Sequence, residues 1–99
     1  MSLIKHILVI DDDPDALLVL EEYLRLEGYN VTTAPDGSSG IHMLTANEVQ
    51  LVITDLNMPG ISGMDVVEIV RKNYPEIPVI VITGYGTEET VLEALRKGA

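Results

Sequence analysis

Oxygen-bearing side chains follow three apolar runs of this sequence. The first run ends in Asp11 and Asp12, and the second ends in Asp55. The third run is followed by Thr83 and Gly84. If the runs are neighbouring parallel strands, these oxygens meet beyond the carboxyl ends of the strands, where open α/β sheets bind their ligands. Carboxylates and a hydroxyl gathered there predict a site for Mg²⁺ and a phosphoryl group.

Three carboxylates in one small space repel each other, so either one of them stays protonated or a cation lies among them. Mg²⁺ prefers oxygen ligands and often binds carboxylates together with a phosphate. A carboxylate can also attack phosphorus and form an aspartyl phosphate, and a metal ion offsets the repulsion between that carboxylate and the phosphoryl group. The Thr83 hydroxyl can donate a hydrogen bond to a phosphoryl oxygen, for which Gly84 leaves room.

Each of these residues also has a structural explanation when it is taken singly. Asp55 can cap the turn before Pro59, and threonine is common at the end of a strand. The neighbouring Asp13 fits the N-cap of a helix that begins at Pro14. The combination of an acidic pair, a single aspartate and a threonine at successive strand ends favours a functional site.

Apolar runs and helical patterns alternate along the whole chain. We expect strands at residues 4–10, 30–34, 50–54 and 79–82. We expect helices from Pro14 to Gly28, over residues 38–46, after Ser62 and over residues 87–97. This alternation predicts an α/β fold, a parallel sheet with helices on both faces.

Local signals set the ends of the expected helices. Ser62 and Asp65 have the spacing of a capping box, which begins a helix. Gly28 is suited to the left-handed conformation that ends one. Leu20 and Leu24 follow at the spacing of a buried helix face.

The composition narrows the class of protein. A length of 99 residues fits one domain, residues 1–99, and a net charge of −10 with only six Lys and Arg argues against direct binding of nucleic acid. The chain has no cysteine, which fits a reducing compartment, and we expect it in the cytoplasm. No apolar stretch reaches the length of a membrane span, so we expect no membrane partner.

Three motifs together resemble the receiver (CheY-like) domains of two-component response regulators. They are residues 7–13, residues 53–63 with the run Asp-Leu-Asn-Met-Pro-Gly, and residues 79–84. The resemblance covers residues 4–99 and implies the flavodoxin-like doubly wound fold, with strand order 2-1-3-4-5.

The resemblance also implies a role for each residue of the acidic site. Asp55 matches the phosphoacceptor, which is also a ligand of Mg²⁺. Asp12 matches the direct metal ligand, and Asp11 matches the ligand that acts through water. Asn57 matches the position whose backbone carbonyl binds the metal.

For the third strand end the resemblance implies a switch. Thr83 matches the hydroxyl that moves toward the phosphoryl group, with Gly84 and Tyr85 as neighbours of that group. Such a domain is not an enzyme acting on a separate substrate. It catalyses only its own phosphorylation and dephosphorylation, and takes the phosphoryl group from a histidine kinase, a phosphotransfer protein or a small acyl phosphate. Phosphorylation then shifts the Thr83 loop and the helix over residues 87–97, whose face is the expected partner surface. The resemblance also implies that an output domain can be present in a longer chain.

The sequence departs from the family after Ala99, because the fifth strand, a Lys-Pro loop and the fifth helix are absent from it. We therefore expect an incomplete receiver domain with strand order 2-1-3-4. Residues 79–82 have the continuous apolar pattern of a strand covered on both faces, yet they would form an edge that invites a dimer or a domain swap. Leu18 and Leu26 would likewise lose a covering neighbour.

Two other functional classes remain open at this point. A haloacid-dehalogenase-type phosphohydrolase would use Asp11, in the D-x-D pattern of residues 11–13, as its nucleophile, but it needs further elements and leaves the Asp55 motif unexplained. A pseudo-receiver would keep the acidic site and bind a protein partner without being phosphorylated. A calcium loop starting at Asp11 is disfavoured, because Ala16 occupies the position that requires glycine.

Overall fold

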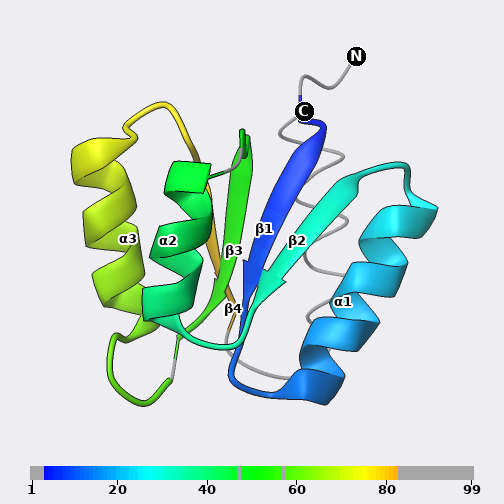
Figure 1. Cartoon of the computed structure of the whole chain (residues 1–99), viewed down its shortest axis with the longest axis horizontal. Helices are drawn as coiled ribbons and strands as arrows, with labels where there is room; N and C mark the ends of the chain where they lie inside the picture. The colour runs from blue at the N-terminus through cyan, green and yellow to red at the C-terminus, as the bar shows by residue number, and fades with distance from the viewer. Residues whose placement is uncertain (1–3, 47, 57, 83–99) are drawn as a thin grey trace.

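A four-stranded parallel sheet forms the centre of the molecule (Figure 1). The computed structural model describes residues 4–46, 48–56 and 58–82. The sheet has the order β2-β1-β3-β4, which confirms the predicted order over its four strands. The strands are β1 (His6–Ile10), β2 (Asn30–Ala34), β3 (Leu51–Asp55) and β4 (Val79–Ile82).

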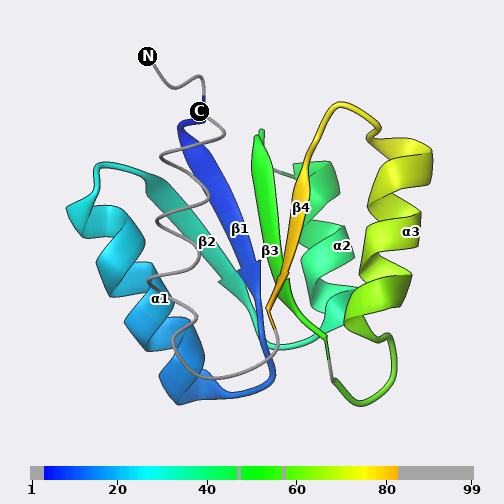
Figure 2. The same ribbon diagram turned by 180° about the vertical axis from the view of Figure 1, so that it is seen from behind.

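Within the described residues, three helices cover the two faces of this sheet. Helix α1 (Pro14–Leu26) lies on one face, and α2 (Gly37–Ala46) and α3 (Gly63–Asn73) lie on the other (Figures 1 and 2). Alternate residues of β1 therefore point into two apolar clusters, with Val9 in the cluster under α1 and Leu8 in the cluster under α2 and α3. A strand buried on both faces explains why the run at residues 7–10 is continuously apolar.

The predicted caps are present at both helices that follow the acidic strand ends. The Asp13 side chain accepts a hydrogen bond of 3.0 Å from the N–H of Asp15 at the start of α1. Ser62 and Asp65 form the predicted capping box of α3. Gly28, with φ of 99°, follows α1 in the conformation that glycine favours.

The start of α2 was only partly predicted. The sequence predicted this helix over residues 38–46, and in the structure it begins one residue earlier, at Gly37. The Asp36 side chain accepts a 2.7 Å hydrogen bond from the N–H of Ser39 in the first turn of α2. This hydrogen bond, together with one from the Ser39 side chain, holds the pKa of Asp36 below its ordinary value.

The two edge strands of the described sheet, β2 and β4, differ in what lies against them. The Arg25 side chain reaches from α1 and donates a 3.2 Å hydrogen bond to the carbonyl of Val31 on β2, while it also pairs with Glu21 at 3.1 Å. Strand β4 pairs with β3, and Val79, Ile80 and Val81 are half-buried rather than covered on both faces as the sequence pattern predicts. The pattern therefore overestimated the burial of this strand within the described residues.

Helix α1 exposes part of its apolar surface. Leu20 and Leu24 are buried as predicted, but Leu18 and Leu26 are 54 % and 87 % exposed. Leu18 and Leu26 do not share the spacing of Leu20 and Leu24 that predicts the buried face, so their exposure agrees with the sequence pattern. Among the described helices, none is long and apolar enough to cross a lipid bilayer.

Candidate functional site

The acidic residues of the sequence meet at one edge of the sheet. Asp11 directly follows β1, Asp55 is the last residue of β3, and these two strands are neighbours. The register that pairs Ile10 with Thr54 brings the two strand ends level. One carboxylate oxygen from each of Asp11, Asp12 and Asp55 lies within 4.8 Å of the others. The predicted acidic cluster is therefore formed.

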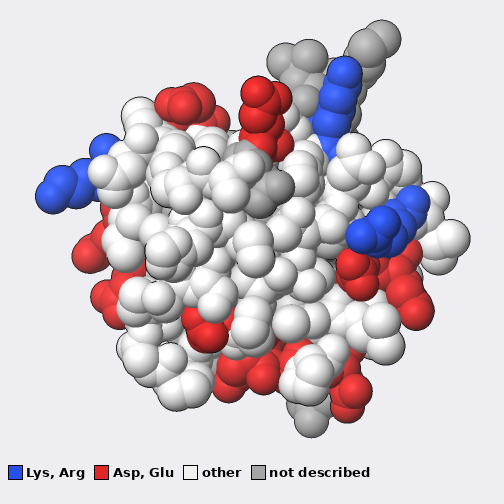
Figure 3. Space-filling model, in the orientation of Figure 1, with Lys and Arg blue, Asp and Glu red and all other residues white. Residues whose placement is uncertain are grey.

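This edge is also where the order of the sheet reverses. From β1 the chain passes first to β2 on one side and later to β3 on the other. The reversal leaves the space beyond the ends of β1 and β3 free of a crossover helix, which is why ligands bind at such points. In Figure 3, acidic side chains line the lower rim below the strand ends and also occur at the top and sides, whereas the Lys and Arg side chains visible in that view all lie above the lower rim.

Asp11 is the enclosed member of the cluster. It is 5 % exposed, and its side chain accepts a 2.9 Å hydrogen bond from the N–H of Asp13. Burial raises the pKa of Asp11 from 3.8 to about 6, and repulsion from Asp55, Asp12 and Asp13 adds to that rise. The Asp13 N–H acts in the opposite direction. The sequence predicted this repulsion between neighbouring carboxylates.

Asp55 is more accessible and is positioned through the backbone that follows it. Asp55 is half-buried, and Asp12 is exposed at the rim of the cluster. The N–H of Leu56 donates a 3.0 Å hydrogen bond to the carbonyl of Ile82, the last residue of β4. The carbonyl of Leu56 accepts a 3.0 Å hydrogen bond from the N–H of Gly63, the first residue of α3. Neither hydrogen bond could be predicted from local sequence patterns, because each forms only once the fold brings the two residues together.

The donor set of the cluster fits a hard divalent cation. Three carboxylate oxygens within 4.8 Å of one another can share one small ion, and oxygen ligands that leave several positions to water are typical of Mg²⁺. The raised pKa of Asp11 reflects the free-energy cost of ionising a carboxyl that is buried and lies close to other carboxylates. A bound cation would offset this cost.

Four predicted site residues lie outside the described part of the chain. They are Asn57, Thr83, Gly84 and Tyr85, and the expected helix over residues 87–97 lies there too.

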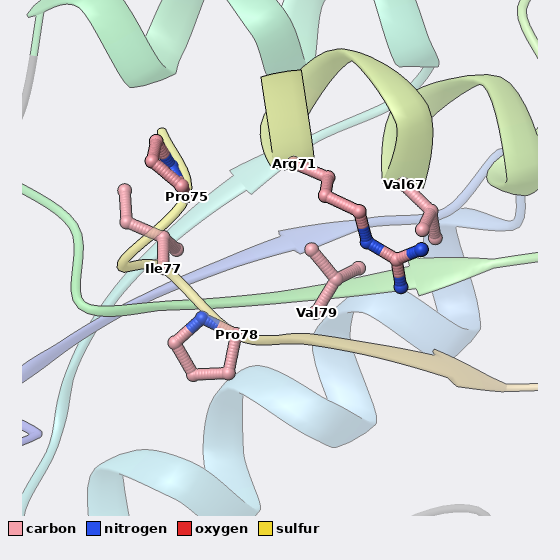
Figure 4. Close-up of a pocket in the computed structure, with 6 residues that line it drawn as sticks. All are labelled: Val67, Arg71, Pro75, Ile77, Pro78 and Val79. Carbon is pink, nitrogen blue, oxygen red and sulfur yellow. The ribbon is translucent and has the colours of Figure 1, made fainter. Parts of the chain in front are cut away.

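A pocket of about 180 Å³ lies elsewhere, between α3 and the segment leading into β4 (Figure 4). Arg71 contributes a guanidinium to walls that are otherwise made of apolar side chains and two prolines. The lining residues are Val67, Arg71, Pro75, Ile77, Pro78 and Val79. Because Pro78 and Val79 stand at the start of β4, this pocket is at the opposite end of the strand from Ile82 and the acidic cluster.

Comparison with known proteins identifies the family. Residues 7–99 match the model of the response regulator receiver domain, and the chain belongs to this family. The haloacid-dehalogenase-type alternative is therefore set aside.

Individual relatives agree with this assignment. The chain is 39 % identical over 93 residues to the transcriptional regulatory protein GlrR of Escherichia coli K12, a match that covers 94 % of this chain and 21 % of GlrR. The structure of the response regulator protein TrrA from Thermotoga maritima, solved in complex with Mg²⁺-BeF, superposes with a TM-score of 0.78 at 37 % identity. That match covers 91 % of this chain and 78 % of TrrA.

A second structure shows TrrA in complex with the histidine kinase ThkA. It matches with a TM-score of 0.77 and 39 % identity, over 83 % of this chain and 71 % of that one. The chain thus spans most of a receiver domain but only about a fifth of the length of GlrR.

Proposed function

We propose that this chain is a phosphoacceptor domain in which a phosphoryl group is transferred, with the help of Mg²⁺, from a histidine kinase or phosphotransfer protein to Asp55. The observation that carries the proposal is the acidic cluster, in which oxygens of Asp11, Asp12 and Asp55 lie within 4.8 Å of one another at the ends of two neighbouring strands. Membership of the receiver family supports it, as does the Mg²⁺-BeF complex of TrrA.

In this proposal, one carboxylate of the cluster accepts the phosphoryl group and the others hold the metal ion. A carboxylate oxygen of Asp55 attacks phosphorus and forms the aspartyl phosphate, while the bond from phosphorus to the donor nitrogen breaks and the donor imidazole keeps the electron pair. Asp12 would bind Mg²⁺ directly, Asp11 through water and Asn57 through its backbone carbonyl. Mg²⁺ would reduce the repulsion between the carboxylate and the incoming phosphoryl group.

The response to phosphorylation would involve the end of β4. The Thr83 hydroxyl would move toward the phosphoryl group, with Gly84 and Tyr85 beside it, and bias the helix over residues 87–97. The 3.0 Å hydrogen bond from Leu56 to Ile82 supports this route, because it joins the residue after Asp55 to the residue before Thr83.

We further propose that residues 1–99 form one receiver domain that works in the cytoplasm beside an output domain. The relatives are longer than the match, since this chain covers 21 % of GlrR. The complex of TrrA with ThkA supports a histidine kinase as the partner. The net charge of −10 makes direct binding of nucleic acid unfavourable.

Intact-mass measurement after incubation with Mg²⁺ and acetyl phosphate tests the proposal. We expect the added mass of one phosphoryl group, and we expect it to be lost with EDTA and in the variant Asp55→Asn. Circular dichroism confirms that the variant is folded. A folded wild-type chain that gains no mass from acetyl phosphate or from a phosphorylated histidine kinase would instead favour the pseudo-receiver.

A further inference from the structure

Gly63 lies in contact with the backbone of Asp55, although eight positions separate them in the sequence. A Cβ atom added at Gly63 would overlap the carbonyl oxygen of Asp55. It would also lie 2.8 Å from the Cα of Leu56 and 2.9 Å from the carbonyl carbon of Asp55. All three are backbone atoms, which cannot rotate out of the way as the end of a side chain can. Any side chain at this position would therefore have to move Asp55 or α3.

Hydrogen bonds hold both partners of this contact in place. The N–H of Gly63 donates to the carbonyl of Leu56, and the N–H of Leu56 donates to Ile82 on β4, each at 3.0 Å. On the other side, the capping box of Ser62 and Asp65 fixes the first turn of α3. Gly63 is the first residue of this capped helix and lies against the end of β3. Its lack of a side chain therefore sets how closely the helix approaches the backbone of Asp55.

The opposite half of the acidic cluster is placed by a separate contact. Asp11 follows Ile10, and Ile10 packs against Gly40 of α2, where the three atoms nearest to an added Cβ would all belong to the Ile10 side chain, with Cγ1 at 2.7 Å. The two halves of the cluster therefore depend on different helices. A displacement of the Asp55 backbone away from Gly63 would act on the β3 side of the cluster, whereas the contact of Ile10 with Gly40 is on the β1 side, so the displacement would alter the separation between the carboxylates.

We propose that Gly63 is a positioning residue for the phosphoryl-transfer site, and that its missing side chain sets the separation between the Asp55 carboxylate and those of Asp11 and Asp12. The inference rests on the proposed function, because it concerns the same metal-binding cluster. It adds that the affinity for Mg²⁺ depends on a residue that has no side chain and lies on another element.

The test compares Gly63→Ala with Gly28→Ala in the 99-residue chain. Gly28 has φ of 99° and no atom within 4 Å of an added Cβ, and it lies beyond the far end of α1 from the acidic cluster (Figure 1). Its replacement therefore strains the backbone without touching the site. Thermal unfolding measures the loss of stability in each variant, and isothermal titration calorimetry with MgCl₂ measures the affinity.

We expect Gly63→Ala to weaken Mg²⁺ binding about tenfold or more, the range seen when residues that support metal ligands are lost. Gly28→Ala should lower the melting temperature and leave the affinity within twofold of wild type. An Mg²⁺ affinity of Gly63→Ala within twofold of wild type would overturn the inference and leave the proposed function standing. A wild-type chain that binds no Mg²⁺ would overturn both.

If Gly63→Ala does not fold, the capping residue decides the question. Ser62→Ala removes the acceptor of the 3.2 Å hydrogen bond from the N–H of Asp65 and loosens the turn that carries Gly63. We expect its Mg²⁺ affinity to fall several-fold and to be restored in Ser62→Thr, which keeps a hydroxyl. An unchanged affinity in Ser62→Ala would then overturn the inference.

Discussion

The ends of β1 and β3 lie side by side in the sheet and bring carboxylates to the same point in different ways. At the end of β1, Asp11 is enclosed and its own side chain is held by the N–H of Asp13. At the end of β3, Asp55 is half-buried, and the backbone after it is held by Ile82 and Gly63. The enclosed carboxylate accumulates the electrostatic penalty that favours a cation, while the accessible one remains open to a phosphoryl donor. In the proposed function, the carboxylate that would hold the metal through water and the one that would accept the phosphoryl group thus have opposite environments, with oxygens within 4.8 Å of each other.

Substitution of Asp12 should give the largest effect, because it removes a proposed metal ligand and leaves the proposed phosphoacceptor in place. In Asp12→Asn the proposed acceptor Asp55 is intact, but the proposed charged metal ligand is lost, so we expect the rate of phosphorylation by acetyl phosphate at fixed Mg²⁺ to fall on the order of 100-fold. Time-resolved intact-mass measurement gives the rate. Asp15→Asn is the control, because it removes the same charge from an exposed position in the first turn of α1. Equal rates in the two variants would contradict the ligand role of Asp12.

Substitution at Asp11 should stabilise the metal-free fold in a pH-dependent way. Below pH 3.8 this carboxyl is neutral in both the folded and the unfolded chain, whereas above about pH 6 it is ionised in both and buried in the fold. A pKa raised from 3.8 to about 6 in the folded chain therefore destabilises it progressively as pH rises through this window, by about 3 kcal/mol at most. Asp11→Asn removes that penalty.

Urea unfolding in EDTA at pH 4 and pH 7.5 measures this difference. We expect Asp11→Asn to gain up to about 3 kcal/mol in the free energy of unfolding at pH 7.5 and little at pH 4. Glu22→Gln, at an exposed position of α1, should show no such change between the two pH values. A gain of equal size at both pH values would mean that packing, and not charge, limits the stability of the β1 end.

Removing the N-caps of α1 and α3, the helices that follow β1 and β3, should have the smallest effects, and these concern the free energy of unfolding. Asp13→Ala and Ser62→Ala each remove the side-chain acceptor of a helix N-terminus, which contributes about 1 kcal/mol. Asp13 also repels Asp11, so its replacement relieves part of the strain at the β1 end. We therefore expect a smaller net loss of stability for Asp13→Ala than for Ser62→Ala, measured by urea unfolding at pH 7.5. The reverse order would show that repulsion from Asp13 is negligible.

Much of the fold and of the acidic cluster could be predicted from local patterns. Strand β2 was predicted at its observed bounds, Asn30–Ala34, and the capping box of Ser62 and Asp65 was predicted residue by residue. Asp11 and Asp55 could be brought together because parallel strands end at one edge of a sheet. Each of these features depends on neighbouring residues or on a general rule of sheet geometry.

The remaining features depend on contacts between segments that are distant in sequence. The close approach of Gly63 to Asp55 and that of Gly40 to Ile10 are set by how helices pack on the sheet. The hydrogen bond from Arg25 to Val31 has the same origin. The half-buried state of β4 likewise depends on which elements cover it, whereas its residue types indicate only a preference for burial.

The Arg25 side chain has a consequence for self-association. A strand added beside β2 would need the carbonyl of Val31 as an acceptor, and the guanidinium already occupies it at 3.2 Å. An incoming chain would have to displace a charged group that is also paired with Glu21, so fibre-like growth of the sheet is disfavoured on this side. Arg25 therefore opposes the pairing of another chain with β2, which affects aggregation rather than signalling.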